Sequence, residues 1–198
     1  SQEQIAGRCC ILMKIGFFGN TNNYPFIVAR AIRKMGHEVL FIVNSDMPLH
    51  RPEHRYSDIS YPYPDWIYDL GHFRPWDFVL PTSRRRAAVR MLRECDAVIL
   101  NEFGPSLVPL IRKPAVAVLT GGDLEVYSNF RNLDSVTNQT YRKRRYLPRS
   151  MIRHGFKKLM ELQRAGIRSA EMVNYFPPGL SPLGDRLLDE IEIGRAHV

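Results

Sequence analysis

The sequence predicts an α/β fold, a Rossmann-like parallel sheet with helices on both faces. Short apolar runs of strand length recur at residues 15–18, 39–43, 97–100, 115–119 and 173–176. Segments with helical periodicity lie between them, and this alternation is typical of βαβ units and a parallel sheet. Most of the strands end in a polar loop that contains glycine, which is where open parallel sheets bind ligands.

Residues 13–43 form the first βαβ unit. Pro25 fits the first turn of its helix, with Asn22 or Asn23 available as the N-cap. The spacing i, i+3, i+4 and i+7 predicts one apolar helix face, formed by Val28, Ala31, Ile32 and Met35. Gly36 is placed to end the helix in the left-handed conformation. The strand at 39–43 completes the unit, with an expected right-handed crossover.

The turn after the first strand is a candidate binding site, made of Gly19, Asn20, Thr21, Asn22 and Asn23. It is not a GxGxxG loop, because only Gly16 and Gly19 are present and asparagines fill the rest. Asparagine tolerates unusual backbone angles and offers amide donors. The turn therefore suits a phosphate or sugar hydroxyls near a helix N-terminus, and a well-capped structural turn is the equal alternative.

Two later loops are the other candidates. One holds Thr120, Gly121, Gly122 and Asp123, followed by Tyr127 in a helical start. Asp123 can accept hydrogen bonds from sugar hydroxyls or orient a base, and the favoured alternative makes it the N-cap of a helix beginning at Leu124. Asn101 and Glu102 follow the preceding strand and are expected to form the opposite wall of one cleft. Glu102 is a candidate general acid or base, with a surface carboxylate as the favoured alternative.

The other segments are more ordinary. Residues 44–80 are rich in Pro and aromatic side chains, which either bind a ligand or, for most of them, cover the sheet edge. Ser83 is expected to cap a helix that runs to about residue 95, and Pro105 to open a short helix. A mobile or substrate-facing segment is expected at 129–148. Helices are expected at 150–165 and 182–191.

The amino-acid composition limits the classes of protein to which the chain can belong. The 198 residues are 44% hydrophobic and carry a net charge of +8, with basic clusters at 84–86, 142–145 and 149–158. That charge permits nucleic acid, anionic lipid or phosphorylated partners, although a solvated helix face is favoured for 84–93. No apolar run approaches twenty residues. The three cysteines and six scattered histidines suggest neither a disulfide framework nor a metal site. A reducing cytoplasm fits this pattern best.

The two ends of the chain are expected to lie outside the domain. Met13 starts the strand pattern, so residues 1–12 are interpreted as upstream translation. Residues 193–198, IGRAHV, resemble one reading frame of a sequencing adapter and are interpreted as an artefactual tail. Residues 13–192 are then a single Rossmann-like domain of a truncated protein.

Four stretches resemble the N-terminal, acceptor-side domain of a GT-B glycosyltransferase, closest to the retaining family 4 group. They are MKIGFFGNTNNYPFIVARAIRKMGHEVLFIV, CDAVILNEFG, KPAVAVLTGGDLEVY and IRSAEMVNYFPPGLSPLGDRLLDEI. The resemblance implies transfer of a sugar from a nucleotide-sugar donor to a hydroxyl acceptor with retention, without a further cofactor. It also implies that the donor is held chiefly by a C-terminal domain, so this fragment is expected to be inactive alone.

By analogy, the turn from Gly19 to Asn23 approaches the donor phosphates and sugar. Thr120 stands where many family members have a histidine, so that catalytic assignment does not transfer. Gly121-Gly122-Asp123 resembles the family's Gly-Ser-Asp variant, and Asp123 is the predicted catalytic residue. The expected acceptor is a glycan or a lipid-linked molecule. Peripheral contact of the basic stretch 142–158 with anionic membrane at the inner face is a further expectation.

Other classes remain open. The same βαβ start and positive charge fit a non-catalytic nucleotide-binding or nucleic-acid-binding module, although no RNP-type or helix-turn-helix signature supports nucleic acid as a partner. An NAD-dependent enzyme is disfavoured, because GxGxxG is missing and Asn44 and Ser45, not an acidic residue, follow the second strand.

Overall fold

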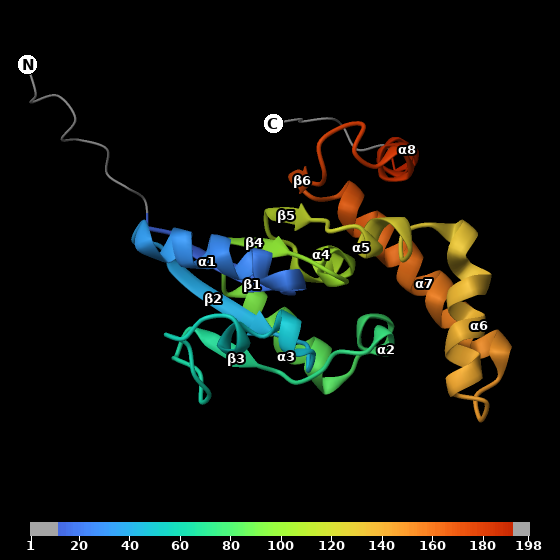
Figure 1. Cartoon of the computed structure of the whole chain (residues 1–198), viewed down its shortest axis with the longest axis horizontal. Coiled ribbons are helices and arrows are strands. Elements are labelled where there is room, and N and C mark those ends of the chain that lie inside the picture. Colours follow the sequence, from blue (N-terminus) through green and yellow to red (C-terminus); the bar gives the residue numbers. More distant parts are fainter. Residues whose placement is uncertain (1–11, 192–198) are drawn as a thin grey trace, which may run out of the picture.

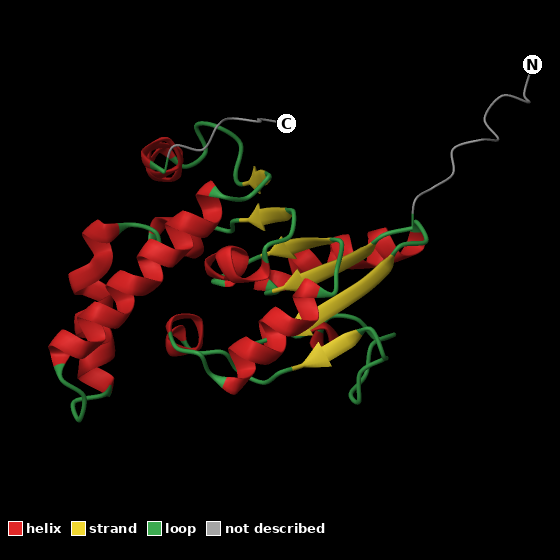
Figure 2. Cartoon of the chain, turned by 180° about the vertical axis from the view of Figure 1, so that it is seen from behind, coloured by secondary structure: helices red, strands yellow, loops and turns green. Residues whose placement is uncertain are grey.

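A computed structural model describes residues 12–191 of the chain, so most of the predicted upstream segment and the predicted tail lie outside the described residues. The fold is α/β, built on a six-stranded sheet whose paired strands all run parallel, in the order β3-β2-β1-β4-β5-β6 (Figures 1 and 2). The strands are β1 Lys14–Phe18, β2 Glu38–Val43, β3 Ile67–Asp69, β4 Ala97–Leu100, β5 Ala115–Val118 and β6 Met172–Asn174.

The helices alternate with these strands along the chain. The α-helices are α1 Tyr24–Lys34, α2 Pro75–Val79, α3 Ser83–Arg93, α4 Val108–Ile111, α5 Gly122–Glu125, α6 Leu133–Lys143, α7 Arg149–Arg168 and α8 Pro182–Glu190. Short 3₁₀ turns are η1 Thr21–Asn23, η2 Pro48–His50, η3 Pro52–His54, η4 Gly104–Leu107 and η5 Phe130–Asn132. The predicted fold class is confirmed. The predicted strands are all present, and only the edge strand β3 was not predicted.

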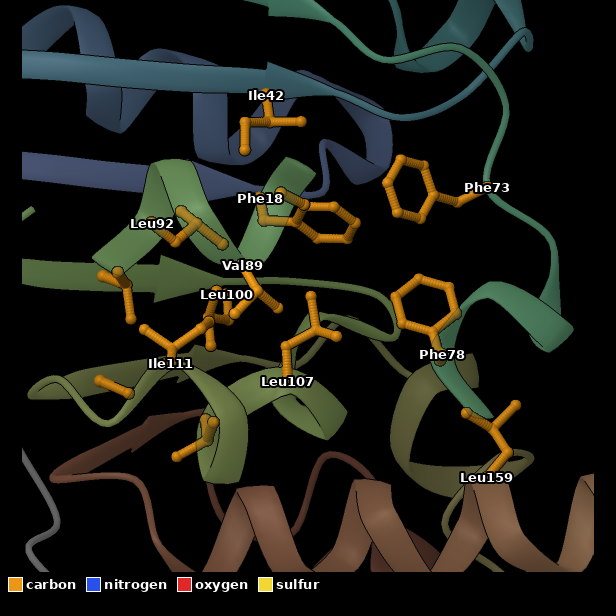
Figure 3. Close-up of a cluster of buried hydrophobic side chains, with 14 of the residues drawn as sticks. Phe18, Ile42, Phe73, Phe78, Val89, Leu92, Leu100, Leu107, Ile111 and Leu159 are labelled. Carbon is orange, nitrogen blue, oxygen red and sulfur yellow. The ribbon is translucent and has the colours of Figure 1, made fainter. Parts of the chain in front are cut away.

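Side chains of alternate residues along each central strand enter different apolar clusters, because a strand points successive side chains to opposite faces. Phe17 and Phe41 pack with Phe26 of α1, whereas the neighbouring Phe18 and Ile42 belong to a larger cluster on the other face. Figure 3 shows that larger cluster, in which α3, α4, α7 and the segment around Phe73 and Phe78 surround the sheet residues. The strands are therefore buried on both faces, as parallel sheets require.

The predicted apolar face of α1 is only partly correct, because Val28 and Ile32 pack against the core whereas Ala31 and Met35 are exposed. Pro25, Phe26 and Ala29 are the buried residues of this helix, and Met35 is 72% exposed. The reason is a distant partner, because Trp66 stacks on Phe26 with ring centroids 5.5 Å apart. Gly36 does end the helix with a left-handed φ of 94°, as predicted.

Two helix caps also differ from prediction. Neither Asn22 nor Asn23 caps α1 through its side chain; Oδ1 of Asn20 accepts from the Phe26 N–H instead, at 3.2 Å. Thr82, rather than Ser83, caps α3 by accepting from the Arg85 N–H. Asn23 thus occupies the N-cap position of α1 as predicted but makes no capping bond, and the cap of α3 lies one residue upstream of the predicted Ser83.

The segment 129–148 was expected to be mobile or substrate-facing, and most of it forms α6, which packs along α7. Leu133 and Val136 are buried in the main cluster, and the Thr137 hydroxyl donates to the Leu133 carbonyl at 2.6 Å. The polar composition hid this helix, because α6 contains few apolar residues.

Some aromatic side chains of residues 44–80 cover the domain, and Trp66 reaches Phe41 of β2, as predicted for a covering role. Trp66 covers α1, and Trp76 packs on Phe156 of α7 with centroids 5.9 Å apart. An ionic group holds the connection together, since Arg51 bridges Glu53 at 2.6 Å and Asp69 at 2.9 Å. No helix within residues 12–191 has the length and apolar character needed to cross a bilayer.

Candidate functional site

The candidate site lies where the strand order reverses, between the neighbouring strands β1 and β4. The loops after these strands leave in opposite directions at such a switch point. Here the two loops touch directly: a Cβ on Gly19 would lie 2.6 Å from the Asn101 carbonyl oxygen, and Gly19 has a φ of +86°. Only glycine fits both the contact and the backbone angle.

Asn101 ties three strand ends together. Its side chain is fully buried; Oδ1 accepts from the Thr21 N–H at 2.8 Å, and Nδ2 donates to the Val118 carbonyl at 2.7 Å. Nδ2 also lies 3.4 Å from Oγ1 of Thr120. The expected gathering of these loops is confirmed, and Asn101 uses its amide to hold them.

Two of the three asparagines after β1 are buried and hold the turn, and the third is exposed. Asn20 and Asn23 are buried; Nδ2 of Asn20 donates to Oδ1 of Asn23 and to the His50 carbonyl, and Nδ2 of Asn23 donates to the Leu49 carbonyl. Asn22 is exposed with a φ of +54°, and its backbone N–H donates to Nδ1 of His50. The side chains of Asn20 and Asn23 therefore shape the turn, and Asn22 faces solvent.

Glu102 lies at the centre of the site and is not a surface carboxylate. It is half-buried with a left-handed φ of +56°, a conformation that costs a non-glycine residue about 1 kcal/mol. Oε2 accepts from Nδ2 of Asn44 at 2.9 Å, and Oε1 lies 3.4 Å from the Asn20 N–H nitrogen and 3.5 Å from the Thr21 hydroxyl. Strained residues of this kind cluster at functional sites.

Asn44, directly after β2, carries an unused acceptor. Only 4% of the residue is exposed, Nδ2 is committed to Glu102, and no described residue donates a hydrogen bond to Oδ1. A buried polar atom without a partner costs roughly 1–3 kcal/mol and calls for an explanation such as a bound water or a ligand. Together, Asn44 after β2 and Glu102 after β4 supply oxygen acceptors from the two strands on either side of β1.

The loop after β5 is ordered by Asp123. The Asp123 carboxylate accepts from the Thr120 N–H at 2.9 Å and from the Leu124 N–H at 3.0 Å. The favoured N-cap interpretation is wrong, because α5 begins at Gly122 with Gly121 as its cap residue. Burial raises the pKa of Asp123 to about 6, and the hydrogen bonds from Thr120 and Leu124 oppose that rise. Gly122 is exposed, and a Cβ there would have open space.

Tyr127 points into the apolar core. Its ring meets Phe103 with centroids 4.7 Å apart and also stacks on Phe156. Burial raises the pKa of its hydroxyl. The structure thus brings together Gly19, Asn20, Thr21, Asn101, Glu102 and Thr120, with Asp123 bonded to Thr120. Asn22 and Gly122 are exposed, no described contact joins Gly121 to the loops after β1 and β4, and Tyr127 packs in the core.

Sequence reasoning missed two contributors. Asn44 was considered only as a missing acidic residue, although its position at a strand end was the signal. Gln163 of α7 is fully buried; Nε2 donates to the Glu102 carbonyl at 2.7 Å, and Oε1 accepts from the Ser106 N–H. A glutamine on the apolar face that holds Leu159 and Ile167 was the signal that could have found it.

The site's polar side chains are neutral amides, the hydroxyls of Thr21 and Thr120, and the carboxylates of Glu102 and Asp123. Within residues 12–191, no three His, Cys, Asp or Glu side chains are grouped so that they could hold a metal ion. Amide and carboxylate oxygens pair well with hydroxyl and N–H donors of a ligand. Comparisons with protein-family models, curated proteins and solved structures find no match to this chain.

Proposed function

We propose that the chain is the acceptor-side domain of a glycosyltransferase that moves a sugar from a nucleotide-sugar donor to a hydroxyl acceptor with retention. One observation carries the proposal: the buried, unpartnered Oδ1 of Asn44 beside the strained Glu102 at the switch point. Sugars present many hydroxyl donors, and neutral amides with a carboxylate are the side chains that accept from them.

In this proposal each part of the site has a separate role. Glu102 and Asn44 accept hydrogen bonds from hydroxyls of the bound ligand. The turn from Gly19 to Asn23, at the N-terminus of α1, faces the donor phosphates, where helix N–H groups favour negative charge. Asp123 is the predicted catalytic residue, and its bonds to Thr120 and Leu124 also order the loop that presents Gly122. Orientation of both substrates and stabilisation of the leaving phosphate supply the rate enhancement.

The proposed acceptor is a glycan or a lipid-linked hydroxyl compound, which the protein binds on the cytoplasmic side. Support comes from the site's polarity, since a hydroxyl-rich acceptor matches its amides. The nucleotide sugar is a co-substrate, and the proposal includes no bound cofactor.

The experiment uses the full-length natural protein. Release of nucleoside diphosphate is measured against a panel of nucleotide sugars and acceptors, for the wild type and for Glu102→Gln. Glu94→Gln, an equal charge change at the exposed residue that follows α3, is the matched control. The proposal expects turnover that Glu102→Gln lowers at least tenfold, about 1.4 kcal/mol, and that Glu94→Gln leaves unchanged.

Two results would contradict the proposal. If Glu102→Gln leaves the turnover rate unchanged, this site takes no part in the reaction. Binding of nucleotide without turnover of any sugar donor would favour the alternative, a non-catalytic nucleotide-binding module that uses the same switch point.

A further inference from the structure

The helical hairpin formed by α6 and α7 carries most of the chain's excess positive charge. Residues 133–161 contain eight Lys and Arg and only two carboxylates, Asp134 and Glu161. Residues 133–161 therefore carry a net charge of +6, against +8 for the whole chain. Between residues 135 and 160 there is no acidic residue at all.

The two carboxylates pair with cations of the helix bodies and leave the cations of the turn without a carboxylate partner. Asp134 pairs with Arg149 and Arg153, and Glu161 lies within ion-pair distance of Lys157 and Lys158. The four consecutive cations Arg142, Lys143, Arg144 and Arg145 form no ion pair with a carboxylate anywhere in residues 12–191. We call residues 142–146, with Met151, the hairpin tip.

The hairpin tip also exposes apolar side chains in an ordered turn. Tyr146 is 76% exposed and Met151 is 57% exposed. The turn is held by the Arg144 N–H donating to the Tyr141 carbonyl, and by the Leu147 N–H donating to the Arg144 carbonyl. Leu147 packs against the main core while its neighbour Tyr146 faces outward. The exposure of Tyr146 is therefore built into the fold.

The position of the hairpin tip suits a flat partner. Figure 1 shows the turn between α6 and α7 at the outer end of the helix pair, away from the sheet, and Figure 2 shows the same projection from behind. A projecting turn can reach a planar surface without obstruction from the sheet or from α1.

We propose that the hairpin tip docks on an anionic lipid bilayer. The cations face the negative lipid headgroups, where each Lys or Arg near the surface strengthens binding. Tyr146 and Met151 enter the interfacial layer, where amphipathic aromatic side chains are favoured. This inference is independent of the proposed glycosyl transfer, because vesicle binding needs no nucleotide or sugar.

A bilayer fits the hairpin tip better than nucleic acid does. Binding to a single strand uses a basic groove with several stacking aromatics, whereas this surface is a convex turn with one exposed ring, Tyr146. Lipid binding makes use of both the cations and the apolar side chains beside them. Nucleic acid is accordingly treated as an outcome that would overturn the proposal.

The test is sedimentation of the chain with vesicles of phosphatidylcholine alone, and of phosphatidylcholine mixed with phosphatidylserine. The site variant is Lys143→Gln with Arg145→Gln, and a second variant is Tyr146→Ser. The matched control is Arg86→Gln with Arg90→Gln, two exposed cations of α3 that carry the same charge change on another surface. Thermal unfolding confirms that each variant is folded.

The proposal expects salt-sensitive binding to the phosphatidylserine vesicles only. At roughly fivefold per cation, losing two tip cations should weaken binding about thirtyfold, Tyr146→Ser should weaken it further, and the α3 control should bind as the wild type does. No binding of the wild type, or equal loss in the α3 control, would overturn the proposal. So would binding of a single-stranded oligonucleotide through Lys143 and Arg145 in the absence of vesicle binding.

Discussion

Gly166→Ala tests how closely α7 approaches the site's supporting turn. A Cβ at Gly166 would lie 1.7 Å from the Pro105 carbonyl oxygen and 2.4 Å from its carbonyl carbon. These are backbone atoms of η4, so no side-chain rotation can relieve the clash. The helix must move away from η4, and Gln163, three residues earlier on α7, would move away from Glu102 with it.

Two opposing terms set the magnitude. Replacing a mid-helix glycine by alanine gains about 1 kcal/mol of helix propensity. Overpacking against a rigid neighbour costs roughly 3 kcal/mol or more, the upper end of the usual range. The free energy of unfolding should therefore fall by about 2 kcal/mol or more, which corresponds to roughly 4–8 °C in the unfolding midpoint for a chain of this size.

Urea unfolding followed by circular dichroism measures this change, with an unchanged denaturant slope as the check that the same structure unfolds. Gly122→Ala is the matched control, because a Cβ there meets nothing within 4 Å, and it should alter stability by under about 0.5 kcal/mol. A Gly166→Ala protein as stable as the wild type, or more stable, would refute the close packing of α7 on η4.

Three further predictions concern the site and the long connection. Folding raises the pKa of Asp123 from 3.8 to about 6, so the protonated carboxyl stabilises the fold below about pH 4 and this stabilisation is lost as the pH rises through 6. In urea unfolding at a series of pH values, the free energy of unfolding of the wild type should fall by roughly 3 kcal/mol relative to Asp123→Asn across this range. Parallel pH profiles of the two proteins would contradict the prediction. Asn101→Leu leaves the Thr21 N–H and the Val118 carbonyl without partners and should cost about 3 kcal/mol in the same assay; a loss under about 1 kcal/mol would argue against its role in joining the loops. Burial raises the pKa of Glu53, but hydrogen bonds from Tyr63 and Arg51 outweigh this effect and lower the pKa below 4.5. The ionised Glu53 therefore stabilises the fold above that pH, and Glu53→Gln should make the loss of stability with falling pH less steep. An unchanged dependence of stability on pH would contradict this.

Local pattern predicted the strands and the loops because both depend on neighbouring residues. Period and apolar run length identify a buried strand, and a polar loop after it must lie at the carboxyl edge of a parallel sheet. These two rules alone place Asn20, Asn101, Glu102 and Thr120 at one edge of the sheet.

Prediction from the local sequence pattern failed where contact with a distant segment determines which residues are buried. The sequence of α1 allows more than one apolar face, and Trp66, forty residues downstream of Phe26, selects the one that is buried. The role of Gln163 likewise depends on α7 crossing η4, a contact between residues 57 positions apart. Long-range packing of this kind leaves no local periodic signal.

The central claim is that the switch point around Asn44 and Glu102 binds a hydroxyl-rich ligand. Its most direct test is a nitrogen-15 NMR titration of the chain with nucleotide sugars, free sugars and NAD, following the side-chain amide of Asn44 and the backbone amide of Glu102. The account predicts that sugar-bearing ligands shift both resonances together and leave the exposed Asn138 side chain of α6 unmoved. Saturating ligand that shifts residues elsewhere while Asn44 and Glu102 stay fixed would contradict it.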